Sequence, residues 1–133
     1  MIRSLVCLGT DILVALLRGD EEAKGAIGTL EDQGEAINTT MITAYELLKG
    51  AAASTREKSR SDVIGLLSQL DILTLTVEAC SEAAEILQAL RENGKTIGEF
   101  DILIAAITIS SREDLLTRDG HFGMVDRLHV RGW

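Results

Sequence analysis

The sequence predicts an α/β fold in which a central parallel sheet is flanked by helices. Short apolar or β-branched runs alternate with longer segments whose apolar residues recur at helical spacing. Such alternation is typical of a parallel sheet that is covered on both faces. The chain of 133 residues contains no proline and shows no repeat, linker or low-complexity segment. We therefore expect one domain that spans residues 1–133.

The N-terminal part predicts a strand followed by two helices. The apolar run 4–8 suits a buried strand. Asp11 is a candidate N-cap of the next helix, because aspartate is favoured at that position, and leucines follow it at helical spacing. A second helix fits residues 21–33, and Gly34 is expected to end it.

The middle of the chain predicts two strands and two helices. A short strand is expected at 35–38, and Thr43 is a candidate start for a helix that continues to residue 53. Another helix fits residues 57–70. The β-branched run 72–75 then predicts a strand.

The C-terminal part predicts two more helices and two short strands. Apolar residues follow helical spacing from Val77, and Asn93 with Gly94 forms a typical C-cap pair. The remaining elements are a helix at 99–110, a strand at 115–117, a helical turn at 120–125 and a strand at 128–130.

The composition excludes some classes of partner and compartment. A formal net charge of −8 leaves no broad cationic surface for nucleic acid, so an RNA partner would be held locally. Cys7 and Cys80 lie in apolar surroundings and are predicted to be small core residues in a reducing compartment. The apolar stretch before Thr10 is too short for a signal peptide or a membrane span. We expect a cytoplasmic protein with no membrane partner.

Isolated acids stand at the edges of apolar segments along the whole chain. Each has a purely structural interpretation. Asp11 can be an N-cap, Glu46 can form a capping box with Thr43, Asp101 suits the start of a helix, and Asp119 suits a turn. Their joint placement at the ends of successive elements instead indicates a metal-binding carboxylate cluster, because sites in parallel sheets lie at the carboxyl ends of strands. The first apolar run leads into Gly9, where such a cluster would be expected to take its first acid.

Four motifs resemble the PIN-domain family of metal-dependent nucleases, and within it the VapC-type toxins of toxin–antitoxin pairs. The resemblance covers essentially the whole chain. The matching segments are Leu8-x-Thr10-Asp11-Ile12-Leu13-Val14, Tyr45-Glu46-Leu47-Leu48-Lys49-Gly50-Ala51, Ile97-Gly98-x-x-Asp101-x-Leu103-Ile104-Ala105-Ala106 and Leu116-Thr117-Arg118-Asp119-x-x-Phe122.

The resemblance implies a metal-dependent endoribonuclease with an antitoxin partner that covers the acidic site, and a homodimer. The family roles assign one or two Mg²⁺ or Mn²⁺ ions to Glu46, Asp101 and Asp119, and Thr117 is similar to the hydroxyl that orients this cluster. Hard oxygen ligands suit these cations, which stabilise the charge that develops when a phosphodiester is hydrolysed.

Position 9 departs from the family pattern, since Gly9 stands where the family has its first acid. This form is therefore expected to be weakened or inactive. Asp11, two residues away, is a candidate replacement ligand, although its capping role competes. The chain is either an engineered inactive form or a naturally degenerate member, and the intact remainder of the motif favours the first.

Other residues and two other classes of function remain open. Lys49 and Arg118 flank the acids and are candidate contacts to an RNA phosphate. His121 and His129 lack the spacing of a metal motif and are interpreted as surface or packing residues, and Trp133 either lies at an interface or closes the core. A non-catalytic PIN-fold module that binds an antitoxin or RNA is the alternative function. A receiver domain fits less well, because no lysine follows the late strand.

Overall fold

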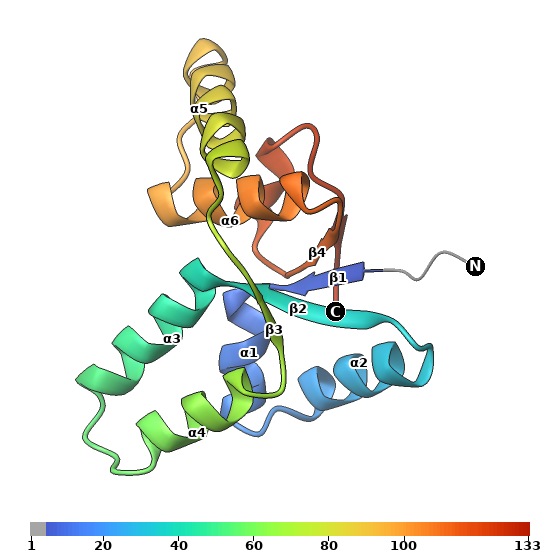
Figure 1. Cartoon of the computed structure of the whole chain (residues 1–133), viewed down its shortest axis with the longest axis vertical. Helices are drawn as coiled ribbons and strands as arrows, with labels where there is room; N and C mark the ends of the chain where they lie inside the picture. Colours follow the sequence, from blue (N-terminus) through green and yellow to red (C-terminus); the bar gives the residue numbers. More distant parts are fainter. Residues whose placement is uncertain (1–4) are drawn as a thin grey trace.

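The computed structural model describes residues 5–133, and its centre is one five-stranded parallel sheet. The strands lie in the order β3-β2-β1-β4-β5 (Figure 1). Their bounds are Leu5–Leu8 for β1, Ala36–Thr40 for β2, Asp71–Leu73 for β3, Asp114–Leu116 for β4 and Val130–Arg131 for β5. The predicted α/β class with a central parallel sheet is confirmed.

Helices cover both faces of the sheet (Figure 1). The helices are α1 Thr10–Leu17, α2 Glu21–Asp32, α3 Met41–Ala53, α4 Ser59–Leu67, α5 Val77–Glu92 and α6 Glu99–Ser110, with a 3₁₀ helix, η1, at Gly120–Met124. Alternate residues of β1 face opposite sides: Val6 and Leu8 pack in the core under α1 to α4, whereas Cys7 packs in the core under α5 and α6.

Several predicted bounds shift because strand pairing decides them. The second strand runs on to Thr40, since Thr40 pairs with Leu73 of β3. The last strand covers Val130–Arg131 rather than 128–130, because these residues pair with β4 while Leu128 is buried in the core. The predicted helix at 57–70 is shorter, and the strand predicted at 72–75 lies at Asp71–Leu73. Ser4, which we included in the first strand, lies outside the described residues.

Two predicted helix caps are wrong. The N-cap of α1 is Gly9, and Asp11 lies inside the helix, because β1 leads into the helix without an intervening loop. The N-cap of α3 is Thr40, whose hydroxyl accepts from the backbone N–H of Thr43, so Thr43 and Glu46 form no capping box. Neither Asp11 nor Glu46 therefore caps a helix.

Other sequence expectations have mixed outcomes. Asn93 caps α5, and Gly94 follows with φ of 66°, as predicted. Cys7 is buried, but Cys80 is exposed, so its assignment to the core is wrong. Trp133 is half-buried and packs against the core beneath α1 to α4, which confirms that it closes the core. Among residues 5–133, no helix is long and apolar enough to cross a membrane.

Candidate metal centre

The candidate centre lies beside the carboxyl ends of β1 and β4. The order of the sheet reverses here, since β2 follows β1 on one side and β4 lies on the other. Ligand sites in open parallel sheets form at such switch points. The backbone N–H of Gly9 donates to the carbonyl of Leu116 at 3.0 Å and joins the two strand ends.

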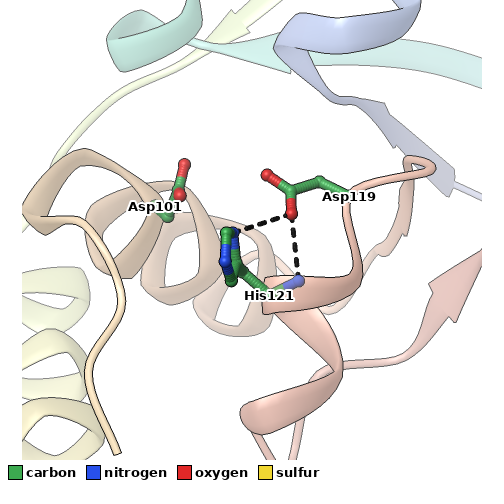
Figure 2. A group of neighbouring side chains, drawn as sticks. All are labelled: Asp101, Asp119 and His121. Carbon is green, nitrogen blue, oxygen red and sulfur yellow. Dashed lines mark hydrogen bonds and ion pairs between the residues drawn. The ribbon is translucent and has the colours of Figure 1, made fainter.

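Two of the predicted acids meet a histidine at this edge. Asp101 lies in the first turn of α6, and Asp119 precedes η1. One ligand atom each from Asp101, Asp119 and His121 lies within 4.8 Å of the other two. Figure 2 shows the imidazole of His121 beside both carboxylates. The His121 Nδ1 is 3.0 Å from Oδ1 of Asp119, which also accepts from the His121 backbone N–H.

Asp101 is the acid whose ionisation the site opposes most clearly. Partial burial raises the pKa of its carboxyl, and the negative charges of Asp119 and Glu46 raise it further, while His121 lowers it. Three acids from α3, α6 and the β4–η1 connection therefore share one electrostatic environment. A bound cation would relieve this repulsion.

A chain of threonine hydroxyls holds Glu46. Thr10 donates to Oε1 of Glu46 at 2.8 Å, so it must accept from Thr43, whose hydroxyl is 3.0 Å away. Thr43 in turn accepts from Thr40, and both are fully buried. Because each hydroxyl carries one proton, the bonds run in one direction and end on the carboxylate.

Asp11 accepts two hydrogen bonds from the β4–η1 connection. Its two oxygens accept from the Thr117 hydroxyl at 3.0 Å and from the Arg118 backbone N–H at 2.7 Å. The Thr117 hydroxyl also accepts from the Asp119 backbone N–H at 3.1 Å. Thr117 therefore connects Asp11 to Asp119.

An exposed aromatic pair borders the acids. Tyr45 and Phe100, which precede Glu46 and Asp101, meet edge to face with centroids 5.6 Å apart and are 53% and 36% exposed. The Lys49 ammonium lies 5.5 Å from the Tyr45 centroid and 5.3 Å from that of Phe100. Rings and cation form one surface on α3 and α6, the helices that also carry Glu46 and Asp101.

Arg118, the other candidate phosphate contact, already has partners. Its guanidinium stacks on the Trp133 ring at 3.6 Å from the centroid and forms an ion pair with Glu22. Its Nε donates to the Trp133 carbonyl. A phosphate would have to compete with these contacts.

Sequence reasoning missed three residues of this arrangement. His121 was assigned to surface packing, yet it lies against Asp119. Its place two residues after a candidate ligand, in a turn, was the available signal. The sequence assigns Thr10 no role at Glu46 and gives Thr43 only the capping box, since a hydroxyl chain between two helices leaves no mark in sequence spacing.

The donor chemistry of the centre fits a divalent cation. The clustered carboxylates are hard oxygen donors, and an imidazole nitrogen lies among them. Partial burial and the charges of Asp119 and Glu46 raise the pKa of Asp101, so the ionised form of this carboxyl is disfavoured in the absence of a cation.

Comparison with known proteins supports the family resemblance. Residues 6–128 match the PIN domain family. The chain is 29% identical to Ribonuclease VapC19 of Mycobacterium tuberculosis over 118 residues, which cover 88% of this chain and 91% of that protein. It resembles the structure of VapBC2 of Rickettsia felis bound to a DNA fragment from its promoter, with a TM-score of 0.90 and 25% identity. The match covers 97% of this chain and 98% of that chain. It also resembles VapBC-5 of Mycobacterium tuberculosis, a member of the VapBC family of toxin-antitoxin systems, with a TM-score of 0.61 and 25% identity. This match covers 72% of this chain and 79% of that chain.

The fold and the match define an α/β nuclease-type domain. The chain belongs to the PIN domain family, and its predicted resemblance to the VapC-type toxins is confirmed. The receiver-domain interpretation is wrong, because the family match covers nearly the whole chain.

Proposed function

We propose that this chain, acting as a single domain of residues 1–133, is a metal-dependent endoribonuclease of a VapBC-type toxin–antitoxin system. The observation that carries the proposal is the meeting of Asp101 and Asp119 beside the charge of Glu46 in a PIN fold. The reaction is hydrolysis of RNA phosphodiester bonds. Similarity to Ribonuclease VapC19 over 118 residues supports a ribonuclease activity.

In this proposal Glu46, Asp101 and Asp119 hold Mg²⁺ or Mn²⁺. When bound, the cation stabilises the charge that develops on the phosphate and acidifies the attacking water. Thr10 fixes the rotamer of Glu46 through its hydrogen bond. Thr117 fixes the connection that carries Asp119, and Asp11 is a positioning residue that anchors Thr117. These contacts hold Glu46 and Asp119 before the cation arrives.

The aromatic pair and Lys49 supply the local RNA contact that the acidic chain otherwise lacks. Bases of single-stranded RNA stack on exposed aromatic rings, and a neighbouring ammonium attracts the phosphates. Tyr45 and Phe100 each adjoin an acid of the centre in sequence. A strand stacked on them would pass beside the metal ligands. The engaged guanidinium of Arg118 makes it the weaker candidate for this contact.

Gly9 makes this form weakened or inactive in the proposal, since no side chain at position 9 can help to hold the cation. The test compares RNA cleavage by this chain, Gly9→Asp and Gly9→Asp/Asp119→Asn in Mg²⁺, in Mn²⁺ and in EDTA. We expect cleavage to rise in Gly9→Asp, to need a metal and to be lost in the double variant. No cleavage by Gly9→Asp under any condition would favour the non-catalytic module that binds an antitoxin or RNA.

We further propose an antitoxin partner, a homodimer and a cytoplasmic location. The antitoxin proposal is supported by the structural relatives, which are VapBC assemblies. The same acidic centre that takes a cation would attract a basic side chain of such a partner. Co-purification with the protein of the neighbouring gene, followed by mass measurement, tests both associations.

A further inference from the structure

Among the described residues, the side chain of the histidine at the centre has one ion-pair partner, Asp119. Besides the contact with Asp119, no ion pair or hydrogen bond of the His121 side chain is found in residues 5–133. Its side chain is 62% exposed, so little packing restrains the imidazole. Rotation about its side-chain bonds can turn either ring nitrogen toward the space between the two acids.

The set of donor atoms differs from one made of carboxylates alone. Asp101 and Asp119 offer oxygen, and His121 offers nitrogen, with the three atoms within 4.8 Å of one another (Figure 2). Gly9, at the adjoining strand end, offers no side-chain donor. Imidazole binds first-row transition metals well, whereas Mg²⁺ strongly favours oxygen.

We propose that the His121 imidazole is a direct ligand at this centre and that it makes the chain select Mn²⁺ and later transition metals over Mg²⁺. The inference rests on the proposed function only insofar as Asp101 and Asp119 bind the cation. The competing role for His121 is a hydrogen bond that orients Asp119 without metal contact. The two roles differ in whether nitrogen enters the coordination sphere.

The test uses the full chain. Its two histidines, His121 and His129, provide one variant at the centre and one matched control variant. Mn²⁺ and Mg²⁺ are titrated by calorimetry into the chain, His121→Ala and the control His129→Ala. We expect His121→Ala to lower Mn²⁺ affinity by about 10-fold or more, and to lower Mg²⁺ affinity by much less. His129 is exposed and outside the centre, so His129→Ala should leave both affinities unchanged.

A spectroscopic measurement separates the direct ligand from the hydrogen-bond role. Pulsed electron paramagnetic resonance of bound Mn²⁺ detects a coordinated ¹⁴N nucleus. We expect this coupling in the chain and in His129→Ala, and its loss in His121→Ala. Mn²⁺ binding without the coupling would overturn the inference while the carboxylate site of the proposed function stands.

A third variant distinguishes failure of the proposed function itself. Asp101→Asn should weaken Mn²⁺ and Mg²⁺ together, because it removes an oxygen ligand that both cations use. If the chain binds neither cation, or if Asp101→Asn changes neither affinity, the metal centre is wrong and the inference falls with it.

Discussion

A β-carbon on residue 9 would lie 2.9 Å from Oδ1 of Asp11. It would also lie 3.0 Å from the Leu116 carbonyl, which is held in place by its hydrogen bond from the Gly9 N–H. The backbone of Gly9, with φ of −71°, is one that any residue adopts. The obstacle to a side chain at position 9 is therefore crowding by Asp11 and the neighbouring strand.

Substitution of Gly9 should destabilise the metal-free chain. Crowding of this kind costs about 1–3 kcal/mol, which exceeds the ~0.4–1 kcal/mol that replacing a glycine gains through the unfolded state. We expect Gly9→Asn to unfold at lower temperature than the chain, and Gly9→Asp lower still, because it adds a charge beside Asp11. Thermal melts of the three proteins measure this order.

Mn²⁺ should then raise the melting temperature of Gly9→Asp more than that of Gly9→Asn. A ligand that binds only the folded state stabilises it in proportion to the logarithm of its affinity, and the added carboxylate raises that affinity. Equal Mn²⁺ shifts for these two variants, which match in size, would place position 9 outside the metal centre.

Thr10→Val should weaken metal binding and also lower stability by about 1–3 kcal/mol, because the buried Thr43 hydroxyl loses its acceptor. The substitution removes the hydroxyl that donates to Glu46 at 2.8 Å and keeps the size of the side chain. Loss of such a supporting hydrogen bond lowers metal affinity by about 10-fold. Thr29→Val is the control, because the Thr29 hydroxyl donates only to the Gly25 carbonyl of its own helix. Unchanged Mn²⁺ affinity in a calorimetric titration of Thr10→Val would contradict the positioning role.

Tyr45→Ala and Phe100→Ala should each weaken binding of single-stranded RNA. Stacking of one base is worth ~1–3 kcal/mol, which corresponds to an affinity loss of about 5- to 150-fold. Val77→Ala controls for loss of exposed apolar surface, since Val77 is 87% exposed at the start of α5. Fluorescence anisotropy with a labelled oligonucleotide measures the affinities. A loss equal to that of Val77→Ala would exclude a specific stacking role.

The stability cost of Asn38→Ala should depend on pH. Asn38 Nδ2 donates to both carboxylate oxygens of Glu113 at 2.8 Å, and Glu113 is only 7% exposed. Burial raises the pKa of Glu113 above the ordinary value of 4.5, and the Asn38 bonds lower it. The native state thus holds this proton more tightly than the unfolded chain, so the free energy of unfolding falls as pH rises from 4.5 through the raised pKa.

Removing Asn38 raises the pKa of Glu113 further, so the free energy of unfolding decreases more as the pH rises. We expect Asn38→Ala to cost about 1.5–3 kcal/mol at a pH above the raised pKa of Glu113, where the carboxylate is charged, and less at pH 4, where it is protonated. Urea unfolding at the two pH values measures the difference. The control is Asn93→Ala, which removes a bond to the Ala89 carbonyl and should cost the same at both. A cost of Asn38→Ala that does not change with pH would contradict the assignment.

The sheet and most helices could be predicted from local patterns in the sequence. The run that forms β1 alternates its side chains between two cores, and Asn93 with Gly94 ends α5 as expected. The caps at Asp11 and Thr43 failed because strand pairing carries β1 and β2 directly into their helices. Local propensity at a cap is worth only ~1 kcal/mol and yields to such pairing.

The sequence by itself determined the α/β class, the parallel sheet and the family, because hydrophobic periodicity and motif spacing are local properties of the chain. It also named Glu46, Asp101 and Asp119 as candidates. Only the tertiary structure decided that Asp11 bonds to Thr117 and the Arg118 backbone, that a hydroxyl chain ends on Glu46, and that His121 lies against Asp119. The direction of a side chain depends on partners from distant elements, and the topology of the sheet brings those partners together.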